Sequence, residues 1–415
     1  MAGTKPSGGS GDYKNFKQTT RDRLLHELVR SCKTGSSKLT HKVLIMDELT
    51  MKIMSGVCKY NDTYNEGVSL LERIERPRLP LRWRDAIYFI QPSKENVIKL
   101  LSDMSGRAPL YRKAFVFFSL PISKELLSLI EKADEAVLAR ISALREINLE
   151  YVAVDSQGFV TSSENGRDLG HLCGSDEEDS SVACLKQMAA RVATVFASLR
   201  EFPIVRYQAS KSAELDVTGM TNFRDLVPTK LAAGIWDCLM KYKETIPNLI
   251  PETETCELLI LDGSVDRSVG VEIWMESGKF TTNELKALNK TRLLGEEKPA
   301  AGKDSSSTLL EELIESLSKG KLSEEDYPYL NDRRPNLKKQ ARSAPHSVRT
   351  RRAQTWSDSD YECSFDYENM GQRIFVVIAG RATRSELRIC HKLTAKFKRE
   401  VVLGFSSLLD PARTS

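Results

Sequence analysis

The feature that most constrains the fold is an alternation of short, unbroken apolar runs with stretches of helical periodicity. The runs KVLIM (42–46), AIYFIQ (86–91) and AFVFFS (114–119) hold almost no charged side chains, as in strands that are buried on both faces. Between two of these runs, SKENVIKLLSDM (93–104) has apolar residues at helical spacing behind a candidate N-cap, Ser93. This alternation predicts an α/β fold built on a parallel sheet with helices on both faces.

The remaining elements of this first unit follow from the same periodicities. A helix is predicted from about Thr20, and a second one over SKELLSLIEKADEAVLARISAL (123–144). A strand is predicted over INLEYVAV (147–154). Residues 1–19 are predicted to form a flexible tail and residues 20–146 the first α/β domain.

A second α/β unit follows, but it has too few strands before residue 262. Strands are predicted at FPIVRY (202–207) and CELLILD (256–262). Helices are predicted in the stretch from Leu185 to Leu199 and in LAAGIWDCLMKYKE (231–244). This unit therefore needs strands from later in the chain.

Two late strands complete the second unit. RIFVVIAG (373–380) and EVVLGFS (400–406) flank a helical stretch, and a strand–helix–strand unit fits the edge of a parallel sheet. We therefore predict a discontinuous second domain, made of residues 147–262 and 370–411.

The segment between the two parts of the second domain shows little pattern of a folded core. Residues 263–308 are predicted to contain a linker at 295–307, residues 309–332 a helical segment, and residues 333–369 a disordered basic and acidic loop. The basic run in this loop favours a solvated segment, with contact to phosphates or anionic lipid as the alternative. Basic residues precede Thr355, which is a candidate phosphorylation site.

The composition excludes several classes of function. A net charge of +4 over 415 residues is too small to indicate nucleic acid as the main ligand. The eight cysteines include no CxxC pair and the five histidines show no metal-ligand spacing, so we expect no metal and no other cofactor. The N-terminus has no apolar signal core, and the most apolar stretch, AFVFFSLPI, is too short to span a bilayer. The expected location is the cytoplasm.

Aspartates end two of the predicted strands, and three roles are open for them. Asp47 and Asp262 lie where α/β proteins place catalytic groups, so a phosphotransfer enzyme with an aspartate nucleophile is one alternative. Neither aspartate belongs to a D-x-D loop, however. The favoured interpretation makes Asp47 the N-cap of the helix that follows. Contact with a partner protein is the third role.

No nucleotide-binding loop is present in the sequence. KTGSSK (33–38) lacks the spacing of a phosphate-binding loop, and it precedes a strand instead of following one. Without a catalytic constellation, the residues favour a binding protein over an enzyme.

Long stretches of the chain resemble one protein family in the same order. They are KVLIMDELTMKIMSGVCKYNDTYNEGVSLLERIERPRLPL, AIYFIQPSKENVIKLLSDM, YRKAFVFFS, EINLEYVAVDSQGF and MGQRIFVVIAGRATRSELRICHKLTAKFKREVVLGFSSLLDP. These stretches are similar to the SM family of syntaxin-binding proteins (Sec-one/Munc-eighteen type). The resemblance implies an arch of three domains, in which a helical domain is inserted into a split α/β domain. It also implies a non-enzymatic protein that binds a syntaxin-type SNARE in vesicle docking, exocytosis and cytokinetic vesicle transport.

The resemblance assigns two binding sites by position. In the family, the segment that faces the SNARE helices inside the arch corresponds to Asp47, Met51, Lys52, Lys59, Glu66 and Glu72. An outer site for the extended N-terminal peptide of the syntaxin corresponds to Leu127, Leu144 and Glu146. There the two leucines would form an apolar socket and the glutamate would meet a basic peptide residue, with ordinary helix packing as the alternative.

One departure from the family is large. After LLILDGSVD (258–266) family members continue into the helical insert, whereas this chain soon reaches NELKALNKTRLLG (283–295), which resembles only the end of that insert. Most of the third domain is therefore expected to be absent, which puts full fusion activity and binding of an assembled SNARE complex in doubt. We expect a monomer that a syntaxin recruits peripherally to the plasma membrane, vesicles or the cell plate.

Overall fold

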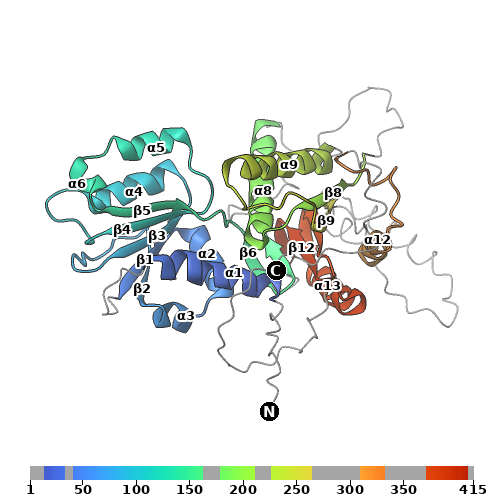
Figure 1. Cartoon of the computed structure of the whole chain (residues 1–415), viewed down its shortest axis with the longest axis horizontal. Coiled ribbons are helices and arrows are strands. Elements are labelled where there is room, and N and C mark those ends of the chain that lie inside the picture. The colour runs from blue at the N-terminus through green and yellow to red at the C-terminus, as the bar shows by residue number, and fades with distance from the viewer. Residues whose placement is uncertain are drawn as a thin grey trace, which may run out of the picture.

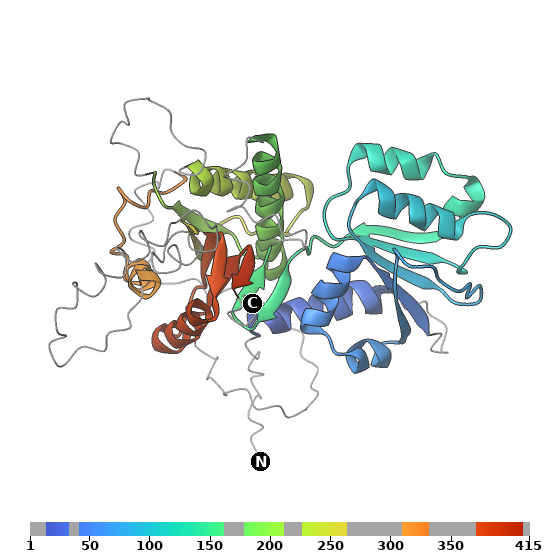
Figure 2. The same ribbon diagram turned by 180° about the vertical axis from the view of Figure 1, so that it is seen from behind.

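The chain folds into two lobes of sheet and helix that lie side by side (Figure 1). The computed structural model describes residues 14–32, 41–161, 178–210, 226–263, 309–331 and 371–409. Seen from behind, each lobe has its own sheet, and a short connection and several helices join the two (Figure 2). They are named here the first lobe and the second lobe, in chain order.

The first lobe contains a five-stranded sheet whose strands all run parallel, in the order β2-β1-β3-β4-β5. Its strands are β1 (Lys42–Met46), β2 (Val68–Arg73), β3 (Ala86–Ile90), β4 (Ala114–Phe118) and β5 (Ile141–Glu146). Helix α1 (Phe16–Arg23) continues as a π-helical turn, η1 (Leu24–Val29), and a 3-10 turn, η2 (Arg30–Cys32). The other helices are α2 (Glu48–Val57), α3 (Tyr60–Asn65), α4 (Lys94–Met104), α5 (Lys124–Glu131) and α6 (Glu135–Leu138).

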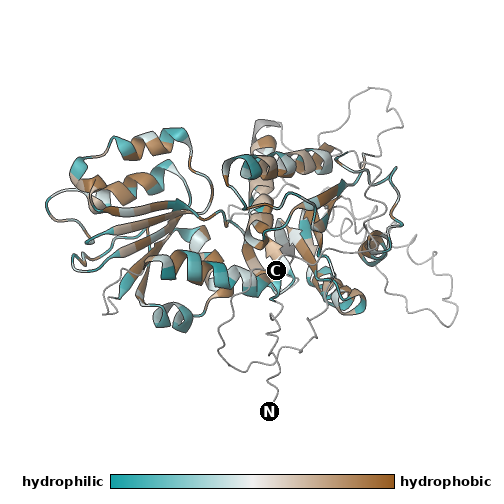
Figure 3. Cartoon of the chain, in the orientation of Figure 1, coloured by the Kyte–Doolittle hydropathy of each residue, from teal (hydrophilic) through white to brown (hydrophobic). Residues whose placement is uncertain are grey.

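Alternate residues of each strand face opposite layers of helix, which explains why the strands are apolar throughout. Leu44 and Met46 of β1 belong to the core under α1 and α2, whereas Val43 and Ile45 belong to the core under α4 and α5. Coloured by hydropathy, the strands are mostly brown and the helices show teal on their outer sides (Figure 3). Surface residues of the two helical layers are thus separated by the thickness of the sheet.

The second lobe has a six-stranded sheet in which two distant parts of the chain meet. Its order is β6-β7-β12-β10-β9-β8, with β6 and β7 antiparallel and the other neighbours parallel. The strands are β6 (Val152–Asp155), β7 (Gly158–Val160), β8 (Pro203–Tyr207), β9 (Cys256–Asp262), β10 (Ile374–Ala379) and β12 (Val401–Phe405). β9 pairs with β10 along its length, up to Asp262 beside Ala379. The prediction of two parallel-sheet α/β domains, the second discontinuous, is confirmed.

Helices cover both faces of the second sheet. α8 (Glu178–Leu199) and α9 (Val227–Thr245) pack on one face, and α12 (Leu309–Ser318) and α13 (Arg384–Phe397) pack on the other. A short parallel pair, β11 (Arg381–Thr383) and β13 (Ser407–Leu409), follows β10 and β12 in the chain.

One helix of the described part of the chain, α8, has the length and apolarity of a membrane span. This stretch is Ser181–Leu199, and 61% of it is buried inside the protein. Its apolar side chains, such as Val192 and Phe196, belong to the main hydrophobic core. α8 is therefore a core helix of the second lobe.

Several predicted boundaries are wrong. The helix predicted over 123–144 ends with α5, and the rest of that stretch forms α6 and β5. The strand predicted over 147–154 begins only at Val152, because the residues before it form a buried connection between the lobes. α1 begins at Phe16, which is buried, so the tail predicted to end at residue 19 is too long. Strands β2, β5, β7, β11 and β13 escaped prediction.

Other predictions concern residues outside the described part of the chain. These are Thr355, the loop at 333–369 and, except for Gly263, the segment at 263–308 with its linker. The segment predicted to be helical at 309–332 contains α12, which is followed by turns and extended residues. The exact domain boundaries stay a prediction.

The early and late parts of the second sheet fit closely at Gly404 of β12. Gly404 pairs with Phe159 of β7, and a Cβ added at Gly404 would overlap the Phe159 ring. The ring therefore lies directly over the strand and closes the sheet between the two parts of the chain.

Replacing Gly404 by alanine should lower the free energy of unfolding by about 1–3 kcal/mol, because the added methyl group overpacks this contact. In the double variant Gly404→Ala/Phe159→Leu the loss should be smaller than the sum of the two single losses, since the two residues share one contact. Urea unfolding of the four proteins measures this coupling. Additive losses would contradict the contact.

Candidate functional site

The carboxyl edge of the first sheet is the first place to look for a site, because parallel sheets bind ligands outside the carboxyl ends of their strands. Asp47 follows β1, Gln91 follows β3 and Ser119 follows β4. This edge faces the second lobe (Figure 1). The side chains at the edge therefore have to be considered together with the residues that cover them.

Asp47 is buried and caps α2. One carboxylate oxygen accepts from the Thr50 amide at 2.9 Å and from the Thr50 hydroxyl at 3.0 Å. The other accepts from the Gln91 amide at 2.5 Å and from the Asn96 side-chain amide at 3.0 Å. Burial raises the pKa of the Asp47 carboxyl, and the amide and hydroxyl donors oppose this shift. The interpretation as an N-cap is confirmed, and a nucleophile at this position has no oxygen turned toward a substrate.

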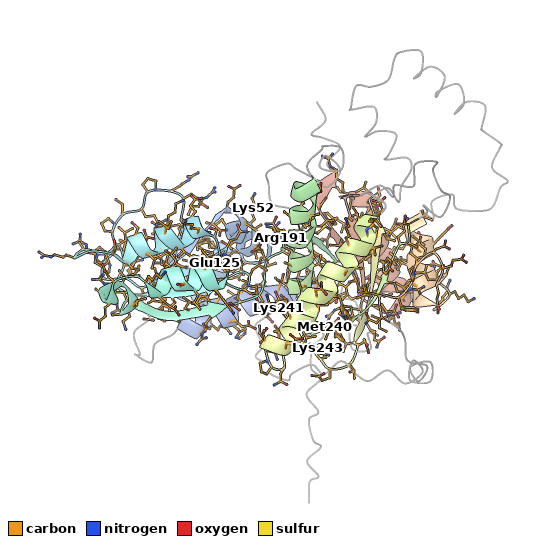
Figure 4. The ribbon with its side chains drawn as sticks, turned by 90° about the horizontal axis from the view of Figure 1, so that it is seen from above. Lys52, Glu125, Arg191, Met240, Lys241 and Lys243 are labelled. Atoms are coloured by element: carbon orange, nitrogen blue, oxygen red, sulfur yellow. The ribbon has the colours of Figure 1, made fainter. Side chains whose placement is uncertain are left out.

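A buried ion pair closes the rest of the carboxyl edge. Glu150, in the connection between the lobes, is 0% exposed, and its carboxylate accepts from Arg191 of α8 at 3.0 Å. The same carboxylate accepts from the Gln91 side chain at 3.1 Å and from the Ser119 hydroxyl at 2.5 Å. In Figure 4, Arg191 lies where the two lobes meet. The position where an α/β enzyme would bind its substrate is thus filled by the second lobe.

The second strand-end aspartate, Asp262, ends β9 of the second sheet. Its backbone amide donates to the Gln208 side chain at 3.0 Å, which ties the end of β9 to the residue after β8. Within the described ranges, no group of three or more His, Cys, Asp or Glu side chains could hold a metal ion.

Asp155 and His391 form a hydrogen-bonded pair that joins the two parts of the second lobe. Asp155 of β6 and His391 of α13 are 3.0 Å apart. Their contact raises the pKa of His391 and lowers that of Asp155, mainly through the hydrogen bond between them. Both side chains are more than one-third exposed, and we assign the pair a structural role.

Two of the residues assigned to the SNARE cavity reach solvent on the α2–α3 side of the first lobe. Lys52 of α2 contacts Glu48 at 3.3 Å, and Glu48 in turn contacts Arg73 at 3.0 Å. Lys59 is exposed and precedes α3, where its amide donates to Asp62. Figure 4 shows Lys52 on the first lobe close to the junction with the second. Lys52 and Lys59, with their acidic neighbours Glu48 and Asp62, are named here the mixed-charge surface.

The other cavity residues are placed differently. Met51 packs against the main core, and Glu66 accepts from Arg30 at 2.5 Å with its side chain 13% exposed. Glu72 pairs with Ile45 in the sheet and accepts from the Tyr111 hydroxyl at 2.8 Å. Glu72 therefore points to the α4–α5 face, opposite to Lys52, and the structure does not bring it together with the lysines.

The three residues assigned to the outer peptide site lie on the other side of the first sheet. Leu127 of α5 is 37% exposed, and Leu144 of β5 is partly buried in the core under α5. Glu146 ends β5 and accepts from the Ile122 amide at 2.9 Å. β5 is the edge strand of the sheet, so its outer side leaves backbone groups open to a further strand.

The network around Glu150 escaped prediction from the sequence. Two charged residues in apolar surroundings could have revealed it: Glu150 within INLEYVAV and Arg191 within MAARVATVF. A charge inside an apolar run is rarely buried without a partner, so each of these residues predicts a partner of opposite charge.

Comparison with known proteins gives the chain its family. The profile of the Sec1 family matches residues 42–269 and 273–414. The chain is a member of the Sec1 family. It is 38% identical to the SNARE-interacting protein KEULE of Arabidopsis thaliana, with 98% of this chain and 95% of KEULE covered. It is 33% identical to the protein transport protein Sec1b of the same organism, with 98% and 95% covered. Family membership confirms that the chain is not an enzyme.

Solved structures of SM proteins share the fold. The Unc18 chain of the Unc18–syntaxin 1 complex of Monosiga brevicollis matches with a TM-score of 0.67 at 15% identity, covering 96% of this chain and 98% of that one. Vps45 in complex with the Qa SNARE Tlg2 matches with a TM-score of 0.62 at 14% identity, covering 96% of both chains.

The comparisons also bear on the missing domain. The alignment with KEULE is 642 positions long, although this chain has 415 residues, so it includes a large gap in this chain. The family match is interrupted between residues 269 and 273, near the point where the resemblance to the family breaks. The helical domain is largely absent, as predicted.

Removing one partner of the Glu150–Arg191 pair should destabilise the protein strongly. Arg191→Leu should lower the free energy of unfolding by about 3–5 kcal/mol, because it leaves a buried carboxylate without its cation. Arg191→Met/Glu150→Gln should recover most of this loss. In the exposed pair with Glu315, Lys319→Ala should cost at most about 1 kcal/mol. Urea unfolding measures all three, and equal losses for Arg191→Leu and Lys319→Ala would contradict the role of the pair.

Proposed function

We propose that this chain binds a syntaxin-type SNARE and acts in vesicle docking and fusion, including exocytosis and cytokinetic transport. The observation that carries the proposal is the similarity to KEULE, a SNARE-interacting protein, over nearly the whole chain. SM proteins of the same fold have been solved with syntaxin 1 and with the Qa SNARE Tlg2. A syntaxin anchored in a membrane would recruit the protein from the cytoplasm to that membrane.

The first contact surface is the mixed-charge surface of α2 and α3, with Lys52 and Lys59 as its contact residues. A SNARE helix bundle exposes charged residues of both signs, and complementary charges set orientation and association rate more than affinity. Asp47 and Glu66 act here by holding α2 and the turn before β2 in place, since both carboxylates are engaged inside the protein.

The second contact surface lies on the outer side of β5, where the syntaxin N-terminal peptide would bind. Leu127 and Leu144 offer apolar area beside an edge strand, and an extended peptide can add to such an edge through its backbone. Glu146 supplies a negative charge at the end of the strand. Because the first sheet lies between the two surfaces, substitutions on one of them should leave the other intact.

The absence of most of the helical domain limits what this form can do. Both proposed surfaces lie on the first lobe, and none of the five strands of its sheet comes from the helical domain. Syntaxin binding should therefore survive. Engagement of an assembled SNARE complex, which involves the helical domain in the family, should be weak or absent.

The outer surface is tested with a fluorescently labelled syntaxin N-terminal peptide and the full chain. Leu127→Ala should weaken binding about tenfold, because the leucine loses apolar contact area. Glu146→Gln keeps an acceptor for the Ile122 amide but removes the charge, and it should weaken binding to a peptide that carries a basic residue. The matched control is Leu138→Ala on α6, where the leucine is 36% exposed. Wild-type protein that fails to bind at high micromolar peptide would contradict this site.

The mixed-charge surface is tested by reversing both lysines. Lys52→Glu/Lys59→Glu should weaken binding of the complete cytosolic part of a syntaxin, mainly through a slower association rate. Binding of the isolated N-terminal peptide should stay unchanged. Surface plasmon resonance with both ligands separates the two effects. Equal losses for both ligands would refute the two-surface arrangement.

A further inference from the structure

Two neighbouring loops form the end of the first lobe that points away from the second lobe. They are residues 78–85, the last part of the connection to β3, and residues 105–113 before β4, at the outer end of the sheet in Figures 1 and 2. The loops are joined by backbone hydrogen bonds from Leu81 to Leu110 at 2.7 Å and from Arg112 to Arg84 at 2.8 Å. We call this surface the distal surface.

Ion pairs hold these loops in place. Arg78 donates to both oxygens of Asp103 at 2.8 and 2.6 Å, and both side chains are buried. Arg112 donates to both oxygens of Asp85 at 2.8 Å. The side chains that protrude from the distal surface are thus presented by a fixed backbone.

The protruding side chains include two large apolar residues. Leu79 is 78% exposed and Trp83 is 69% exposed, more than any other large apolar residue in the described part of the chain. Exposed leucine and tryptophan cost free energy in water. Tryptophan favours the boundary between lipid headgroups and acyl chains.

Cations surround the two apolar residues. Arg82, Arg107 and Lys113 are exposed, and Arg84 donates to a neutral partner, the Ser69 hydroxyl. The acid of the two loops, Asp85, already binds Arg112. Glu75 begins the same connection at the carboxyl end of the sheet, where it binds Arg73 and the Glu48 amide. The acids Asp134 and Glu135 are the N-cap and the first residue of α6, on the β5 side of this edge. The surface beside β3 and β4 therefore carries a net positive charge.

We propose that the distal surface binds the anionic face of a lipid bilayer, independently of any SNARE. Arg82, Arg107 and Lys113 approach lipid phosphates and carboxylates, while Trp83 and Leu79 enter the headgroup layer. A bilayer can accept protruding apolar side chains without a matching pocket, whereas an acidic peptide would satisfy the cations and leave Trp83 and Leu79 exposed. The charge and the apolar residues together favour a membrane.

The place of this surface fits a protein that acts beside a membrane. It lies at the amino ends of the strands, whereas the second lobe covers the carboxyl ends. Lys52 on α2 and Leu127 on α5 belong to the two helical layers that cover opposite faces of the sheet. A bilayer on the distal surface would therefore leave both proposed syntaxin surfaces accessible.

The test uses the full chain and vesicles that contain no protein. Wild-type protein should cosediment with vesicles of phosphatidylcholine and 30% phosphatidylserine at low salt, and not with phosphatidylcholine alone. Arg82→Glu/Lys113→Glu should weaken binding at least about 25-fold, since each basic residue near such a surface contributes about fivefold. Leu79→Ser/Trp83→Ser should weaken vesicle binding about tenfold or more.

Tryptophan fluorescence gives a second readout. Vesicles should shift wild-type tryptophan emission to the blue, and Trp83→Phe should remove the shift.

The matched control is Lys186→Glu/Lys241→Glu, which makes the same charge change at exposed sites of α8 and α9 and should bind vesicles like the wild type. Equal losses in both charge variants would mean that net charge alone drives binding, and would overturn the proposal. So would vesicle binding that the distal variants leave unchanged, or no vesicle binding by the wild type. If an acidic peptide binds through the cations of the distal surface and vesicles do not, the ligand of this surface is a protein segment and not a membrane. Each variant should still bind the syntaxin N-terminal peptide, which separates this result from the proposed function.

Discussion

The contact between Glu150 and Arg191 is the interaction on which the arrangement of the two lobes depends. Glu150 lies in the short connection between the sheets, and its carboxylate also binds Gln91 and Ser119 at the ends of β3 and β4. A charge without water is stable only with its partners in place, so the orientation of the lobes and the integrity of this network are coupled. One continuous apolar core, which contains residues of α1, α2, α8 and α9, supports the same junction.

The junction explains how an α/β architecture serves a binding protein. The edge of the sheet that would hold a substrate in an enzyme instead attaches the second lobe. Asp47 lies at this edge, and both of its carboxylate oxygens accept hydrogen bonds inside the protein, where the residue caps α2. What remains for recognition is the outside of the first lobe: its two helical layers, its edge strand β5 and its amino end. These surfaces face different directions, so one rigid sheet can present the proposed contacts with a SNARE and with a membrane separately.

The sequence predicts the class of fold and the split second sheet because fully buried parallel strands are apolar without interruption, as in AIYFI and IFVVIA. β2 and β5 escaped recognition for the converse reason: VSLLER and ISALRE are edge strands with polar and apolar residues mixed. The resemblance to the family identified candidate binding residues, but it could not show in which direction their side chains point. Only the register of β2, with Glu72 beside Ile45, shows that Glu72 points away from Lys52.

The split of the second sheet between β9 and β10 has a consequence for the history of such chains. The two strands pair directly, and their following glycines, Gly263 and Gly380, approach so closely that a side chain on either would meet the other's backbone. The ladder itself joins residues 257–262 to residues 374–379, and closing a longer or shorter excursion between them changes the entropy only slowly with its length. A gene could therefore lose or regain an inserted domain at this point, by exon skipping for example. The sequences of β9 and β10, which pair with each other, would stay unchanged on either side of the insertion.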